Sequence, residues 1–261
     1  MAEVIENEPV RAAKLLDAQA KAVLLFDAIV ERGLIAAGVR EVAASDAIRD
    51  LAAEMFGTTK FWHKRIVRAG VNTLLPYRDN PPDRVIADDD IVFADFGPIF
   101  EQFEADFGRT FVIGDDPVKH RLRDALPRIF DAGRQRFESD PDITGAQLYS
   151  YVAELARQDG WEFGNDHAGH LVGQFPHETI DGAQIESYIA RGSDHPMRRL
   201  DRTGASVTGS WRFTWSTGYG SSAASMRNCS TSATDPKSPK TDNPLPSGTK
   251  IHAPETHSGR A

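Results

Sequence analysis

Two aspartates stand at the adjoining ends of two apolar segments and could share one chemical task. Asp95 ends the apolar run 91–94, and Asp106, eleven residues later, begins the segment 107–113. A bent hairpin between the segments would bring both carboxylates together. Two carboxylates at close range repel each other unless a cation lies between them, so the pair is a candidate cation site. The alternative is that both are ordinary residues at strand ends.

A second candidate group is the histidine-rich segment 165–178. His167, His170 and His177 are three of the eight histidines of the chain. Glycines flank the His170 region and let the backbone approach a site closely. Imidazole combined with carboxylates suits Mn, Fe, Co or Zn rather than a thiolate-type site. Taken alone, the cluster also fits surface or hydrogen-bonded structure.

The elements that must position these groups follow from the hydrophobic periodicity. Helices are predicted at 9–34 and from the cap residue Ser45 to Gly57, and then at 118–137 and 145–159, the last capped by Thr144. Antiparallel strands are predicted between the helix pairs, at 65–69, 84–87, 91–96 and 107–113, and short strands follow at 161–163 and 167–173. This order predicts an α+β fold in which one helix-and-strand unit is used twice.

Composition excludes several classes of protein. The 261 residues carry a net charge of −8, whereas a nucleic-acid groove or an anionic membrane needs a positive partner surface. Cys229 is the only cysteine, which excludes an internal disulfide and fits a reducing cytoplasm. The sequence has neither a signal-peptide core nor an apolar run of about 18 residues, so we expect neither secretion nor a membrane span.

The composition changes after about Gly204. From there to Ala261 Ser, Thr, Gly, Pro, Lys and Asn dominate, and no apolar period continues. Such a segment cannot bury enough surface to offset its ordering entropy. We therefore predict one domain over residues 1–204 and a disordered, aberrant tail over 205–261.

Together the motifs resemble those of the methionine aminopeptidase, Xaa-Pro peptidase and creatinase superfamily, which has the pita-bread fold. Four motifs occur in the family's order over about residues 9–202: Asp95-x-Gly, Asp106-x-x-Arg-Thr, Gly-His170-x-x-Gly and His177-Glu. The segment 70–76, Gly-Val-Asn-Thr-Leu-Leu-Pro, also looks like the family's substrate-side loop.

The resemblance implies a two-metal hydrolase with two Asp, one His and two Glu ligands. Asp95, Asp106 and His170 would be metal ligands, and His177 would face the scissile carbonyl and help to stabilise the tetrahedral intermediate. The divalent metals (Mn, Co, Fe or Zn) would lower the pKa of a water molecule and polarise the carbonyl. Arg109 would support Asp106 from behind, the alternative being a surface ion pair.

The substrate side departs from the family. Tyr77 and His63 are expected there, but Tyr77 stands where relatives commonly carry a histidine. A tyrosine can donate one hydrogen bond yet cannot act as a base near neutral pH. The resemblance therefore leaves the peptide specificity open.

Both glutamate ligands are also missing, because no glutamate follows Arg202 before Glu255. Codons read one nucleotide earlier permit His-Trp-Ile-Leu-Glu-Ile-His-Leu over 208–215 and Gly-Phe-Tyr-Glu-Glu-Leu over 224–229, which look like the family's ligand strands. We hypothesise a frameshift between about Gly204 and Thr208. The alternative is a genuine, diverged linker.

Three functions follow from these features. The first is a metallopeptidase-like hydrolase of peptides, impaired because three ligands hold at most one metal weakly. The second is a non-catalytic binding protein on the same fold, and the third is a creatinase-type hydrolase of a small C–N substrate. An uncovered sheet face would favour a homodimer.

Overall fold

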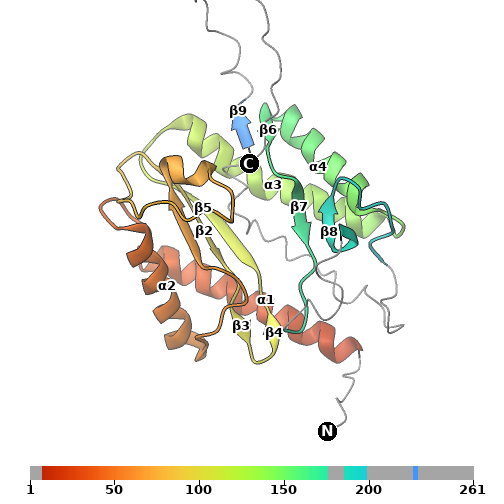
Figure 1. Cartoon of the computed structure of the whole chain (residues 1–261), viewed down its shortest axis with the longest axis horizontal. Helices are drawn as coiled ribbons and strands as arrows, with labels where there is room; N and C mark the ends of the chain where they lie inside the picture. The colour runs from red at the N-terminus through yellow and green to blue at the C-terminus, as the bar shows by residue number, and fades with distance from the viewer. Residues whose placement is uncertain (1–7, 176–184, 199–225, 229–261) are drawn as a thin grey trace, which may run out of the picture. The chain divides into compact units, whose positions relative to one another are not determined.

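The chain uses one arrangement of helices and strands twice, as a computed structural model shows for residues 8–175, 185–198 and 226–228 (Figure 1). The first half comprises α1 (Glu8–Glu31), α2 (Glu41–Phe56), β1 (Ile66–Ala69), β2 (Ile91–Phe96) and β5 (Phe107–Val112). The second half comprises α3 (Pro117–Ser139), α4 (Gly145–Gln158), β6 (Trp161–Phe163), β7 (His167–His170) and β8 (Tyr188–Ala190). The predicted α+β order is confirmed.

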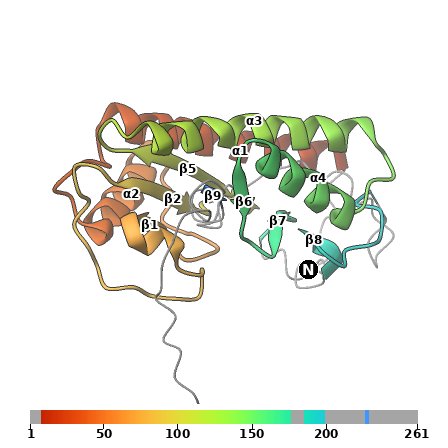
Figure 2. The same ribbon diagram turned by 90° about the horizontal axis from the view of Figure 1, so that it is seen from above.

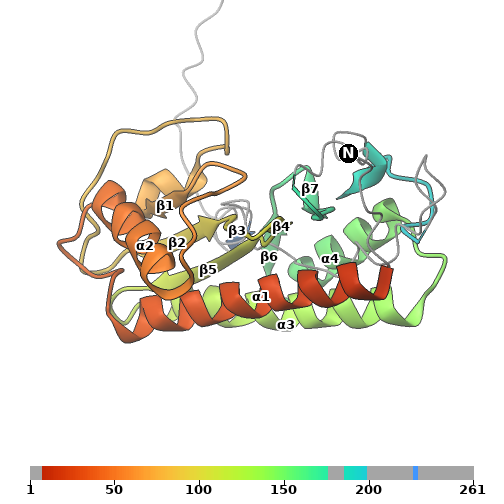
Figure 3. The same ribbon diagram turned by 90° about the horizontal axis from the view of Figure 1, so that it is seen from below.

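The first half is built on an antiparallel sheet of order β1-β2-β5. Helices α1 and α3 run along one side of the strands (Figures 2 and 3). Helix α1 buries Leu25, Phe26 and Ile29 in the same core as Val92 and Phe96 of β2. This apolar packing fixes β2, the strand that carries Asp95.

The second half has short strands, as predicted. Strand β7 pairs with β8, and β6 pairs with β9 (Met226–Asn228). Thr144 begins α4 with a capping box: its hydroxyl accepts from the Gln147 N–H, and the Gln147 side chain accepts from the Thr144 N–H. Of the predicted tail, the structure describes only Met226–Asn228, so the expectation for 205–261 otherwise lies outside the described residues.

A small hairpin between β2 and β5 of the first half contacts the second half. Strands β3 (Ile99–Phe100) and β4 (Phe103–Glu104) pair through a tight turn at Glu101, whose φ is 58°. The backbone N–H of Glu104 donates to the Gly173 carbonyl at 3.0 Å. That contact ties the segment after β7 to the first half, and the periodicity of the sequence does not predict it.

Helix α2 begins earlier than its cap signal indicates. The prediction of Ser45 as the cap is wrong, because the helix starts at Glu41 and Arg40 provides no side-chain cap. The buried Glu41 carboxylate instead accepts hydrogen bonds from the Ala69 N–H and from Asn72 Nδ2. These contacts from outside the helix stabilise its first turn and replace a local cap.

The predicted strand 84–87 is also wrong. Val85 forms only an isolated bridge with Arg40. Asp90 holds this segment in a turn, because its carboxylate accepts hydrogen bonds from the Ala87 N–H at 2.8 Å and from Arg84 Nη2 at 2.6 Å. The segment Gly70–Leu74, at the start of the loop expected on the substrate side, forms a short 3-10 helix.

No helix in the described part of the chain has both the length and the apolar character that a membrane crossing requires.

Candidate metal centre

Strand pairing brings the two aspartates together. In the β2–β5 ladder Asp95 lies opposite Gly108 and Phe96 lies opposite Phe107, so Asp106 stands directly beside the end of β2. The side chains of Asp95 and Asp106 are 0% and 1% exposed. Two carboxylates are therefore held out of water at one point, an arrangement that is costly without positive charge between them.

His170 reaches this point from the second half. Its Nε2 lies 3.0 Å from Asp106 Oδ2, and its Nδ1 lies 2.8 Å from the Leu171 carbonyl oxygen. The carbonyl can only accept, so Nδ1 is the donor and Nε2 is the atom directed at the carboxylate. The structure thus places three of the predicted site residues, Asp95, Asp106 and His170, in one cluster.

His63 approaches the same pair from the segment before β1. Its Nε2 lies 3.7 Å from Asp95 Oδ1 and 3.6 Å from Asp106 Oδ1. Its Nδ1 lies 2.8 Å from the Lys64 carbonyl oxygen. His63, Asp95 and Asp106 form a group whose possible ligand atoms all lie within 4.8 Å of one another.

The electrostatics of the centre are dominated by its buried charges. Burial lowers the pKa of His63, but the carboxylates of Asp95 and Asp106 outweigh it and raise that pKa from 6.5 to about 9. Burial also opposes ionisation of Asp106, yet the two imidazoles hold its pKa below the usual range. His167 differs, because burial and then the neighbouring His170 lower its pKa to about 4.

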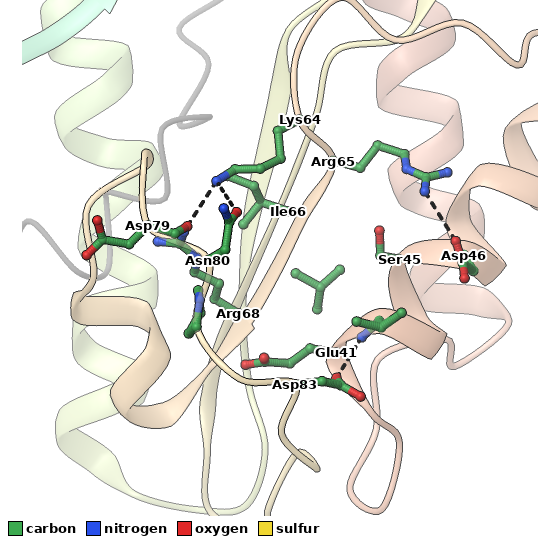
Figure 4. A pocket seen from close by; sticks show the side chains of 13 residues that line it. Glu41, Ser45, Asp46, Lys64, Arg65, Ile66, Arg68, Asp79, Asn80 and Asp83 are labelled. Carbon is green, nitrogen blue, oxygen red and sulfur yellow. Dashed lines mark hydrogen bonds and ion pairs between the residues drawn. The ribbon is translucent and has the colours of Figure 1, made fainter.

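Lys64 and Arg68 hold the loop that carries Tyr77. Figure 4 shows both side chains beside Asp79 and Asn80 of this loop. Lys64 Nζ donates to the carbonyls of Tyr77 and Asp79, and Arg68 donates to those of Leu75 at 2.5 Å and Asp79 at 2.7 Å. Both cations line a hollow of about 320 Å³ beside β1. The Lys64 N–H also donates to Tyr77 Oη at 3.1 Å, which orients the phenol.

Two further predictions have different outcomes. Arg109 does not support Asp106: its Nη1 lies 3.0 Å from Asp27 Oδ1 of α1, and its side chain is 31% exposed, so it forms the surface ion pair. His177 lies outside the described residues. Its role therefore stays a prediction.

Sequence reasoning missed the groups that pack around His63. The Trp62 ring lies against the rings of His63 and His170, with centroids 4.4 and 5.5 Å away, and its Nε1 donates to the Ala105 carbonyl. A side chain at Gly97 would collide with His63 and Trp62. The glycine in the Asp95-x-Gly motif was the one available signal of this close packing.

The donor set suits a divalent cation. Carboxylate oxygens and imidazole nitrogens are ligands for Mn, Fe, Co or Zn. In both His63 and His170, Nδ1 is hydrogen-bonded to a backbone carbonyl and Nε2 faces the carboxylates, as is usual for histidines that bind metals.

Comparisons with known proteins agree with this chemistry. Residues 13–203 match the model of metallopeptidase family M24. The Xaa-Pro dipeptidase of Pyrococcus horikoshii is 26% identical over 171 residues, which are 62% of this chain and 48% of that protein. The chain thus spans about half the length of the curated relatives it matches.

Solved structures share the fold. The X-Pro aminopeptidase of Thermotoga maritima superposes with a TM-score of 0.56 at 23% identity, covering 73% of this chain and 51% of that one. The methionine aminopeptidase of the same organism gives a TM-score of 0.55 at 16% identity, covering 76% and 75%. The expected pita-bread fold is confirmed. With most of its length matched by the family model, this chain belongs to metallopeptidase family M24.

Proposed function

We propose that this chain is a metal-dependent peptidase that acts at the amino-terminal end of peptides, with an Xaa-Pro bond as the favoured substrate. The observation that carries the proposal is the buried pair Asp95 and Asp106, with His170 Nε2 3.0 Å from Asp106 Oδ2. The relatives named as Xaa-Pro dipeptidases support the choice of substrate.

The three side chains would hold a divalent cation of Mn, Co, Fe or Zn. Such a cation lowers the pKa of a water molecule to near neutrality and polarises a substrate carbonyl. Asp106 offers its two oxygens in different directions, Oδ1 toward His63 and Oδ2 toward His170. The protein's contribution is to keep these donors dry and oriented.

Tyr77 and His177 would bind the substrate by hydrogen bonds. Tyr77 Oη accepts a hydrogen bond from the Lys64 N–H, and burial raises the pKa of its phenol. A neutral phenol suits hydrogen bonding to a peptide rather than proton abstraction. His177 is proposed to face the scissile carbonyl, on the strength of its motif.

We further propose that peptidase activity is low in this chain. No glutamate occurs between Glu186 and Glu255, whereas the family's two-metal centre uses two. Loss of a single outer-shell partner costs about 10–100-fold in metal affinity or activity, so loss of two direct ligands should cost more. A cytoplasmic location and a homodimer are our further predictions.

The test is an assay of the purified chain loaded separately with Mn, Co, Fe or Zn. Xaa-Pro dipeptides, peptides with amino-terminal methionine, and small amidino compounds would be compared. Metal-dependent release of proline that disappears in the Asp106→Asn variant supports the proposal. Hydrolysis of the amidino compounds alone would instead show a creatinase-type enzyme.

The absent glutamates favour one competing function, a non-catalytic binding protein on the same fold. Such a protein would bind peptides without cleaving them. It would also contain no stoichiometric metal after purification in metal-supplemented medium. Metal content therefore separates the two functions before any assay of turnover.

A further inference from the structure

We infer that His63 is a direct metal ligand of this centre, so that the chain supplies two imidazoles and two carboxylates. The inference rests on the proposed metal site at Asp95 and Asp106. It departs from the two-Asp, one-His, two-Glu set that the family resemblance implies. It also departs from the expectation that His63 lies on the substrate side.

The distances around His63 are those of neighbouring ligands on one ion. Two donor atoms that each lie about 2.1 Å from a metal at a tetrahedral angle are about 3.4 Å apart. His63 Nε2 is 3.7 Å from Asp95 Oδ1 and 3.6 Å from Asp106 Oδ1. A small inward movement of the ring would complete this geometry on the Asp95 side of the centre.

The orientation of the imidazole is already that of a ligand. His63 Nδ1 lies 2.8 Å from the Lys64 carbonyl oxygen, which can only accept, so Nδ1 carries a proton. Nε2 is therefore the nitrogen presented to the carboxylates. His170 uses the same device with the Leu171 carbonyl at 2.8 Å. Because the Nδ1 of each histidine has a backbone carbonyl as its partner, we assign both histidines the same role, metal binding through Nε2.

The surroundings of His63 hold it at this point. Its side chain is 7% exposed, so little of it faces water, where a substrate would arrive. Trp62 packs its ring against both His63 and His170. Gly97 leaves room for both rings, since a Cβ there would collide with them. The imidazole of His63 thus faces Asp106 Oδ1 and that of His170 faces Asp106 Oδ2. With Asp95, these side chains give four possible ligands, and His63 takes the place of one missing glutamate.

The experiment counts imidazole ligands in the full-length protein. Zinc would be added to one equivalent, and X-ray absorption would be measured for the wild-type chain, His63→Ala, His63→Gln and Gly97→Ala. Equilibrium dialysis would give the zinc affinity of each. His195→Ala is the matched control, because His195 is exposed. Circular dichroism would show which variants fold.

We expect one imidazole fewer in the folded His63 variant than in the wild-type chain, with zinc affinity reduced by more than about 10-fold. Gly97→Ala should weaken zinc binding in the same way while leaving the histidine in the sequence. His195→Ala should change neither quantity.

Three results would overturn the inference, and they are distinguishable. An unchanged imidazole count and unchanged affinity in folded His63 variants would return His63 to the substrate side and leave the proposed function intact. Unchanged zinc binding in Gly97→Ala would contradict the packing argument. A wild-type chain that binds no zinc, manganese, cobalt or iron would remove both this inference and the proposed function.

Discussion

His170 Nε2 lies 3.0 Å from Asp106 Oδ2, although the two residues belong to different halves of the duplicated arrangement. The hydrogen bond from the Glu104 N–H to the Gly173 carbonyl connects the two segments close to these residues. The centre is therefore assembled from both halves at the point where β4 meets the segment after β7.

Arg68 should be a strong determinant of the Tyr77 loop. The buried guanidinium donates to the carbonyls of Leu75, Pro76 and Asp79, and Arg68→Met would leave them without that donor. We expect the free energy of unfolding to fall by about 3 kcal/mol. We also expect faster proteolysis of segment 75–82. Urea denaturation and limited proteolysis would measure these effects.

Arg78→Met is the control for this prediction, because Arg78 lies on the same loop with its side chain 87% exposed. It should change stability by less than about 0.5 kcal/mol. Equal stability losses in the two variants would contradict the role given to Arg68.

Asp116 should make stability depend on pH at the start of α3. Its carboxylate accepts from the N–H groups of Val118 at 2.8 Å and Lys119 at 3.4 Å, and the first of these contacts chiefly lowers its pKa. A lowered pKa means that the contribution is present above the unfolded value of 3.8 and is lost as pH falls through the folded value.

Asp116→Asn keeps an acceptor but does not titrate, so the stability difference between wild type and variant should shrink as pH falls below about 4. Urea denaturation between about pH 3 and 7 at low salt would measure it. A difference that stays constant over this range would show that Asp116 ionisation does not stabilise the helix.

Thr144→Ala should destabilise the second half. The variant loses the hydroxyl that accepts from the Gln147 N–H, and we expect a cost of about 1 kcal/mol. Ser150→Ala is the control on the same helix, because its hydroxyl only bonds back to the Ala146 carbonyl. A cost as large for Ser150→Ala as for Thr144→Ala would refute the capping account.

Restoring one nucleotide between the codons of Gly204 and Thr208 should restore peptidase activity. The restored frame would supply glutamates in two strands, so we expect two metals per chain and a rise in turnover of more than about 100-fold. His170→Ala should abolish turnover in the restored protein, whereas the present protein has little turnover to lose. Equal activity and equal metal content in both proteins would mean that the glutamates were never ligands.

The parts of the fold that local patterns govern were predictable from the sequence. The Thr144 cap, the Gly57 stop and the apolar strand before Asp95 all depend on residues near one another in the chain. The start of α2 was not predictable, because buried Glu41 is bound by groups of the 69–72 segment rather than by a local cap.

Three of the candidate ligands were predictable from the sequence, but the position of His63 was not. Asp95, Asp106 and His170 stand in recognisable motifs, and the β2–β5 register follows from the hairpin between the aspartates. The place of His63 beside the carboxylates depends on the packing of Trp62 and Gly97. That packing is a tertiary property with no periodic signal in the sequence.

Anomalous diffraction from crystals soaked in Mn or Co would show whether a metal centre forms at the paired aspartates. We expect a strong peak between Asp95, Asp106 and His170. Asp106→Asn should lose the peak, whereas Asp88→Asn, a change at an exposed turn, should keep it. A folded wild-type chain with no peak at these side chains, or an equal peak in Asp106→Asn, would show that the paired aspartates do not form a metal centre.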